Sequence, residues 1–316
     1  MICSGTVTDI NRDVAATLKL CGPAVLVTES GTVVPDLAEV LLSVIQKRHP
    51  CQQDFGDELD EILEESSEYD WLVIETAMDV LTCLSVALGP SFGEVWKMFE
   101  KPVVKYASSN EAAERAAAVG TIAECVGNMG ESCTPYTHSL FKLLLHRLGD
   151  EDADTKSNAV YGVGLLCEKT KNDEEILSQI STLFSKLEPL LDAQDKPRLL
   201  DNTAGCVSRL ISKYPTKIPI AEVLPRLVQL LPLREDYEEN KPIYGMIVKL
   251  CKFHRGLSKR PTSILMIIAD QANEPTAQQL TPTLMPIFEK VLSPPEEQLE
   301  DETRSQLVEL VKYLQK

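Results

Sequence analysis

Six of the nine cysteines in this chain recur at a nearly constant interval. They are Cys21, Cys83, Cys125, Cys167, Cys206 and Cys251, and the last five are separated by 42, 42, 39 and 45 residues. The intervals after Cys83 each hold two apolar segments with helical spacing. Such two-helix units stack in a row and bury a continuous core, so the period predicts a solenoid with a long binding face.

The repeated cysteines do not indicate metal or disulfide chemistry. No Cys-x-x-Cys pair occurs in the chain. Cysteines one repeat apart would lie about 9 to 10 Å from each other, which is the spacing of packed helices and is beyond the reach of a disulfide. We therefore expect them to be small buried hydrophobic residues. The odd total of nine cysteines favours a reducing compartment.

The period and the apolar pattern predict an all-α fold, an α-solenoid of HEAT repeats with about six to seven helix pairs and a capping terminal helix. The first helix is expected over 9–20. The pairs are expected at 34–48 with 68–88, 91–105 with 110–127, 134–148 with 152–169, 173–191 with 195–213, 218–231 with 236–254, and 258–270 with 275–292. The terminal helix is expected over 298–315.

We expect residues 1–316 to form one solenoid. The first helix occupies the second position of a pair whose first helix is missing, so we expect a carboxy-terminal fragment of a longer protein. One stretch departs from the period. Residues 52–70 are rich in Asp and Glu around Phe55, Leu59 and Ile62, which predicts an acidic amphipathic helix inserted within a pair. A solvated or mobile acidic loop remains the alternative.

Net charge narrows the possible partners. The formal charge is −17, which argues against direct binding to nucleic acid or to an anionic membrane. An acidic surface instead favours a basic partner, although acidity also serves solubility. No uninterrupted apolar run approaches the roughly 20 residues that a membrane span requires.

The sequence does not support an enzyme, a metal site or a cofactor site. The four histidines show no zinc-ligand spacing. Asp150, Asp152 and Asp154 resemble the start of a calcium loop, but the required glycine and final glutamate are absent. Gly162 and Gly164 lie within a helical pattern, so they do not form a dinucleotide loop.

A candidate binding surface comes from polar residues on the second helices, which line the inner face of a solenoid. An Asn amide can bond a peptide backbone, Tyr can cover the stem of a lysine, and carboxylates can pair with its ammonium. The alternative is that the Asn residues cap or bridge helices and that the Tyr residues only pack. The candidates are Asn158, Tyr161, Asp201, Asn202, Glu235, Asp236, Glu238, Glu239 and Tyr244.

Two segments carry a resemblance to a known family. Ser157-Asn-Ala-Val-Tyr-Gly162 and Asp201-Asn-Thr-Ala-Gly205 resemble the carboxy-terminal HEAT repeats of importin-β-type karyopherins, within the importin-four subfamily. The resemblance is most specific over 150–255. It implies that a lysine of a bound peptide is received by Tyr161, Asn202, Glu238 and Glu239, with Asn158 and Asp201 beside them.

The resemblance also implies a function. Family members are nuclear import receptors that shuttle between cytoplasm and nucleus, and this subfamily carries core histones and ribosomal proteins. The implied partners of the full-length receptor are basic cargo, the small GTPase Ran and Phe-Gly nucleoporins, with no direct nucleic acid or membrane contact. A monomer is expected. The alternative is a static HEAT scaffold of the phosphatase-scaffold or tubulin-binding type.

Overall fold

The computed structural model describes residues 2–29, 31–52, 63–231 and 233–255. Their contacts divide the chain into two compact units, Met1–Leu177 and Ser178–Lys316, called unit 1 and unit 2 here. Both units are helical in the described residues. The only strands there are β1 (Val27–Thr28) and β2 (Gly31–Thr32), which form a two-residue hairpin after the 3-10 helix η1 (Gly22–Leu26).

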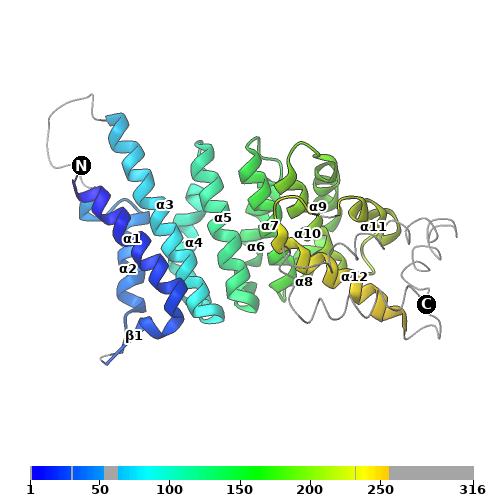
Figure 1. Cartoon of the computed structure of the whole chain (residues 1–316), viewed down its shortest axis with the longest axis horizontal. Coiled ribbons are helices and arrows are strands. Elements are labelled where there is room, and N and C mark those ends of the chain that lie inside the picture. The colour runs from blue at the N-terminus through cyan, green and yellow to red at the C-terminus, as the bar shows by residue number, and fades with distance from the viewer. Residues whose placement is uncertain (1, 30, 53–62, 232, 256–316) are drawn as a thin grey trace. The chain divides into compact units, whose positions relative to one another are not determined.

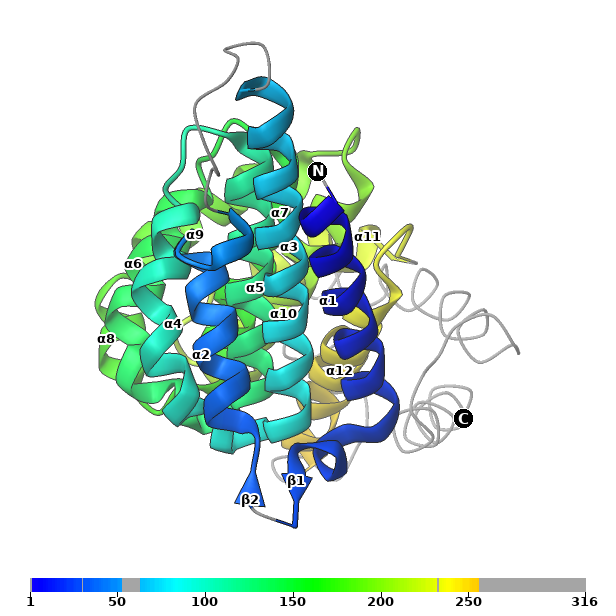
Figure 2. The ribbon, with the colours of Figure 1, turned by 90° about the vertical axis from the view of Figure 1, so that its left-hand side faces the viewer.

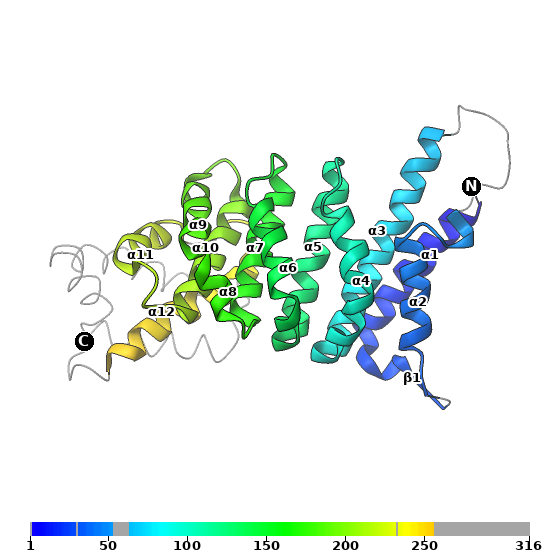
Figure 3. The same cartoon turned by 180° about the vertical axis from the view of Figure 1, so that it is seen from behind.

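Unit 1 is built from helices that alternate between two layers (Figures 1 and 2). One layer holds α1 (Ile2–Cys21), α3 (Leu63–Leu88), α5 (Ala112–Met129) and α7 (Ala153–Lys169), each packed against the next. The other layer holds α2 (Val34–Ile45), α4 (Phe92–Tyr106) and α6 (Thr137–Arg147), which lie in front when the unit is seen from behind (Figure 3). The predicted pairing of helices is confirmed for this unit.

Short 3-10 helices make the turns between the layers of unit 1. They are η2 (Pro50–Gln52), η4 (Gly89–Ser91) and η5 (Gly130–Tyr136). Gly89 and Gly130 have φ of +52° and +55°, so each ends a helix in the left-handed region that only glycine adopts at little cost. The short α8 (Asp173–Ser178) follows α7.

The core of unit 1 explains most of the cysteine period. Cys125 and Cys167 are fully buried and Cys83 is 2% exposed. Burial raises the pKa of the Cys125 thiol to about 12, so it remains a neutral, hydrophobic group at physiological pH. Cys206 in unit 2 is likewise buried. The expectation was wrong for Cys21, which is exposed because it is the last residue of α1, before the turn at Gly22.

A long apolar stretch begins in helix α3. Within the described residues, one helical stretch, Asp70–Tyr106, is long and apolar enough to cross a membrane by length and composition alone, contrary to the expectation from the sequence. This stretch is weak evidence for a membrane span, because 56% of its apolar window is buried inside the protein. The side chains of Ile74, Ala77 and Leu81 face the core and are fully buried.

Unit 2 contains α9 (Ile180–Leu187), η6 (Glu188–Asp192), α10 (Pro197–Lys213), α11 (Ile220–Gln229), η7 (Tyr237–Glu239) and α12 (Asn240–Arg255). Helix α10 packs against α12, η6 and η7. The expected single helix over 173–191 is instead α8, α9 and η6. Gln179 leaves helical geometry between the first two, with φ of −120°, and Pro189 opens the third.

Several predicted elements fall outside the described residues. The helices expected at 258–270, 275–292 and 298–315 do so entirely. Within the acidic insertion of 52–70, residues 63–70 form the first turns of α3 rather than a separate helix, and residues 53–62 are not described.

Candidate binding surface

The candidate residues of unit 2 surround the connection that leads from α11 to α12. Helix α10 begins with a proline, whose fixed φ suits the first turn of a helix. One turn later, Asp201 is 1% exposed. Its Oδ2 accepts hydrogen bonds from the backbone N–H groups of Arg234, Glu235 and Asp236 at 2.9, 2.8 and 3.0 Å. The carboxylate of Asp201 therefore holds this connection against α10.

A buried ion pair fixes the same connection two turns further along α10. The guanidinium of Arg209 donates to both oxygens of the Glu239 carboxylate, with one N···O distance of 2.9 Å. Glu239 is fully buried and Arg209 is 7% exposed. A pair of this kind is stable only when both charges are present, because a single buried charge without its partner is costly.

Glycine at position 205 makes room for this ion pair. A Cβ at Gly205 would lie 1.4 Å from Oε2 and 2.4 Å from Cδ of Glu239. The backbone of α10 and the carboxylate of Glu239 are thus in direct contact. Gly205 and Arg209 were not among the predicted site residues. The sequence signal that could have identified them is their spacing of four residues on one helix face, opposite a run of acidic residues.

Between these two attachment points the connection presents acidic side chains to solvent. Glu235 and Glu238 are exposed, Asp236 is half-buried, and Tyr237 is 45% exposed. Burial, followed by the negative charge of Glu238, raises the pKa of Asp236 above its ordinary value, while Arg198 acts in the opposite direction. We call Glu235, Asp236 and Glu238 the acidic edge. A cation placed there would relieve repulsion between carboxylates.

Two further candidates of unit 2 lie in its interior. Asn202 on α10 is 1% exposed, and Tyr244 on α12 is fully buried. These two helices pack against each other. In this arrangement neither side chain is open to solvent.

The two candidates of unit 1 lie on α7 and are half-buried. Asn158 donates from Nδ2 to the carbonyl oxygen of Ala116 on α5 at 2.9 Å, and so bridges neighbouring helices. Gly120 leaves space for this contact, since a Cβ there would lie 3.1 Å from Nδ2 of Asn158. Tyr161 keeps part of its surface in solvent.

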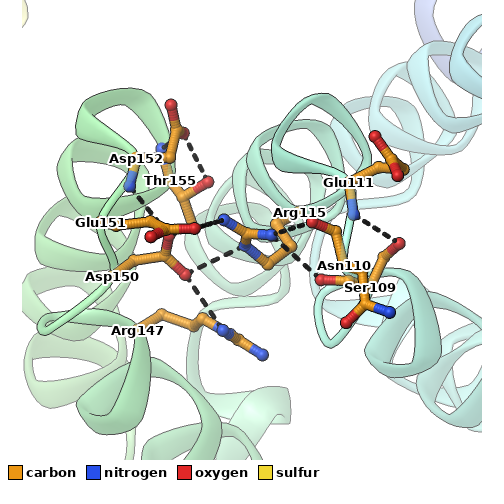
Figure 4. A network of polar contacts seen from close by, with 9 residues as sticks. All are labelled: Ser109, Asn110, Glu111, Arg115, Arg147, Asp150, Glu151, Asp152 and Thr155. Carbon is orange, nitrogen blue, oxygen red and sulfur yellow. Dashed lines mark hydrogen bonds and ion pairs between the residues drawn. The ribbon is translucent and has the colours of Figure 1, made fainter.

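Unit 1 also contains a buried charge cluster that the sequence did not reveal (Figure 4). The Arg115 side chain on α5 donates two hydrogen bonds to the carboxylate of Asp150, at 3.0 and 3.1 Å. Its Nη1 also donates to the carbonyl oxygens of Ser109 and Asn110. Arg147 donates to the same carboxylate at 3.0 Å. The loop between α4 and α5 is thereby tied to the loop between α6 and α7.

The charge cluster controls the ionisation of Asp150. Burial alone would raise its pKa, but the bonds from Arg115, the backbone of Asp152 and Arg147 outweigh burial and lower the pKa below its usual range. Within the acidic run at 150–154, Asp150 thus joins two loops and Asp152 caps a helix. Asp152 caps α7 by accepting from the backbone N–H of Thr155 at 2.7 Å.

Curated relatives of this chain are importins. It is 38% identical over 288 residues to the probable importin subunit beta-4 of Schizosaccharomyces pombe, which covers 88% of this chain and 25% of that protein. It is 32% identical to importin-4 of Homo sapiens over 206 residues, covering 65% of this chain and 19% of the human protein. The chain therefore spans about a quarter or less of these relatives. No family model matches it.

Solved structures with the same architecture are karyopherins. Importin beta matches with a TM-score of 0.58 at 14% identity, covering 99% of this chain and 39% of importin beta. A mutant of Kap121p matches with a TM-score of 0.56 at 16% identity, over 96% of this chain and 28% of Kap121p. Kap95p, in a structure concerned with its binding to RanGDP, matches with a TM-score of 0.51 at 16% identity, over 98% and 34% of the two chains. These matches confirm the all-α HEAT solenoid fold.

Proposed function

Since this chain is a homologue of importin-4 and importin subunit beta-4, we propose that it forms part of a nuclear import receptor and binds basic protein cargo. The observation that carries the proposal is the homology to the fungal protein over 88% of the chain. The net charge of −17 supports it, because a strongly acidic surface attracts lysine-rich partners.

We assign the cargo contacts to the acidic edge. Glu235 and Glu238 are exposed and are available to pair with the ammonium groups of an extended lysine-rich segment. Asp201 and Glu239 serve the edge indirectly, since their carboxylates hold the connection that carries it. In unit 1, Tyr161 offers a partly exposed ring that could cover the stem of a lysine.

The cargo class is proposed from the resemblance of two segments to the importin-four subfamily, and the acidic net charge supports a basic cargo. Lysine-rich segments of core histones and of ribosomal proteins are the proposed cargo. Acetylation removes the ammonium charge, so a peptide acetylated at the bound lysine should bind more weakly. We further propose that the full-length receptor shuttles between cytoplasm and nucleus and binds Ran.

A pocket in unit 2 supports a second proposed partner. It has a volume of about 400 Å³ and lies between α9 and α11, lined by Ile180, Phe184, Leu187, Leu191 and Val223 among others. These apolar residues can contact an aromatic ring, while Glu188, Glu222 and Arg226 line the polar part of the pocket. We propose that it receives the phenylalanine of a Phe-Gly nucleoporin repeat. Val223→Glu should abolish capture of a Phe-Gly peptide while leaving the binding of basic peptide unchanged.

The cargo proposal is tested by fluorescence anisotropy with a labelled core-histone tail peptide. The variant Glu235→Lys with Glu238→Lys removes two exposed carboxylates and adds two cations. The control, Glu29→Lys with Glu39→Lys, changes the net charge equally at exposed positions of unit 1. We expect the acidic-edge variant to lose binding and the control to retain most of it.

The rival interpretation is a static HEAT scaffold that contacts folded partners and does not hold an extended peptide. It predicts that neither the histone peptide nor any short basic peptide binds the intact chain. Equal weakening in both variants would assign the binding to overall charge rather than to the acidic edge.

A further inference from the structure

Unit 1 contains a cleft whose charge is opposite to that of the protein. The cleft has a volume of about 860 Å³ and lies where the end of α2, the second half of α4 and the loop between α4 and α5 meet. Lys47, Lys101 and Lys105 line it, together with a single carboxylate, that of Glu114. A volume of this size is in the range of ligand-binding clefts, which is roughly 300 to 1,000 Å³.

The three lysines are available to a ligand. All three are exposed. Among the described residues, no carboxylate oxygen lies within 4.0 Å of the ammonium nitrogen of any of these three lysines. Lys97 and Lys171, by contrast, each form an ion pair with a glutamate. Lys101 and Lys105 also stand four residues apart on one face of α4, where like charges repel. An anion between the lysines would remove this repulsion.

Helix stability accounts for only part of this arrangement. Lysines near the carboxy-terminal end of a helix complement its dipole, which fits Lys105 in the last turn of α4. The effect is confined to the last turn, and Lys101 lies before it. The dipole therefore leaves the position of Lys101 unexplained.

Lys47 is held in a strained backbone conformation at the rim of the cleft. Its φ is +54°, and it is the one non-glycine residue with positive φ among the described residues. Its N–H bonds to the carbonyl of Val44 and the next N–H bonds to Ser43, the pattern of a helix end that normally carries glycine. Glycine would form this turn at lower cost. A binding role for the lysine side chain would offset this cost.

We propose that this cleft binds a carboxylate-rich segment of a partner protein. The three ammonium groups pair with Asp or Glu side chains, and the polar loop between α4 and α5 provides groups that can bond a peptide backbone. A short acidic peptide meets only the cleft. A nucleic acid is disfavoured, because its phosphates would extend beyond the cleft and be repelled by the acidic remainder of the chain.

The test is anisotropy titration of the full chain at low salt with a labelled peptide containing six consecutive glutamates. The same peptide with glutamines, and a labelled single-stranded oligonucleotide, serve as comparison probes. Replacing Lys101 or Lys105 by Gln should weaken binding about two- to five-fold each, as expected for exposed ion pairs. Glu114→Gln should strengthen it. Lys142→Gln, an exposed lysine on α6 outside the cleft, should have no effect.

Lys47→Gly separates a binding role from a structural one. We expect its unfolding midpoint to be unchanged or higher and its affinity for the glutamate peptide to fall about two- to five-fold. No binding of the glutamate peptide, equal loss in Lys142→Gln, or tighter cleft-dependent binding of the oligonucleotide would each overturn the proposal. Because the probe is acidic, this result is independent of the binding of basic cargo.

Discussion

The carboxylate of Glu239 occupies the space that a side chain at Gly205 would need, with Oε2 only 1.4 Å from the position of a Cβ. The contact is possible because Arg209, one turn along α10, neutralises the carboxylate that it helps to bury. One glycine and one ion pair thus join α10 to the connection that carries the acidic edge.

Gly205→Ala should destabilise unit 2 by about 3 kcal/mol or more, since the added methyl group displaces Glu239 from its buried partner. Gly245→Ala on α12 is the matched control, because a Cβ there meets nothing within 4 Å. The control should instead stabilise by about 0.5 to 1 kcal/mol through helix propensity. Urea unfolding followed by circular dichroism measures both. Equal effects in the two variants would show that Gly205 is not closely packed.

Asp150→Asn should destabilise unit 1 by about 3 kcal/mol, because it leaves the guanidinium of Arg115 buried without a counter-charge. Glu151 also lies near Arg115, at 3.8 Å, but its side chain is 92% exposed. Glu151→Gln should therefore change the stability by less than about 0.5 kcal/mol. Denaturant unfolding at pH 7 compares the two. A larger effect in Glu151→Gln would contradict the assignment.

The same carboxylate predicts the direction of a pH dependence. The pKa of Asp150 is lowered in the folded state, so its contribution to stability is present above the unfolded pKa of about 3.9 and is lost as pH falls through the lower folded pKa. The stability difference between the parent chain and Asp150→Asn should shrink over that acidic interval. Unfolding curves from pH 7 down to pH 3 measure it, and a constant difference would refute the prediction.

Asp201→Ala should release the connection at its first attachment point. Three backbone N–H groups lose their acceptor, which costs about 2 to 3 kcal/mol. Hydrogen exchange at Arg234, Glu235 and Asp236 should become faster, while α10 itself keeps its protection. Asp195→Ala, an exposed residue just before α10, is the control. Unchanged exchange at the three amides would mean that other contacts hold the connection.

Basic peptide should bind the acidic edge more tightly as pH rises through the raised pKa of Asp236. The sign follows because an ammonium group prefers the ionised carboxylate, so binding lowers this pKa and releases a proton. Affinity measured from pH 4 to pH 7 should therefore increase more in the parent chain than in Asp236→Asn. Identical pH profiles would exclude Asp236 from the binding surface.

The sequence predicted the repeating architecture because helix pairs and their buried positions recur at a readable period. Cys83, Cys125, Cys167 and Cys206 were correctly expected in the core. The break at Gln179 was missed because no proline or glycine marks it. Periodicity reports burial along a helix and carries no information on such local turns.

The roles of polar residues were harder to predict. A buried Asp201 or Glu239 looks the same in sequence as an exposed carboxylate that awaits a ligand. What distinguishes them is a partner 30 or more residues away, such as Arg209 for Glu239 and the amides at 234–236 for Asp201. Arg115 and Asp150 were missed for the same reason, since they are 35 residues apart.

The attachments of the α11–α12 connection to α10 also restrict its length. Asp201, Gly205 and Arg209 stand four residues apart along one helix face, and they engage residues 234–236 and 239 in the same order. An inserted or deleted residue between positions 236 and 239 would leave one attachment intact and shift the other out of reach. Length variation among homologues should therefore fall outside this interval, and the spacing of the exposed carboxylates should be as fixed as the helix beneath them.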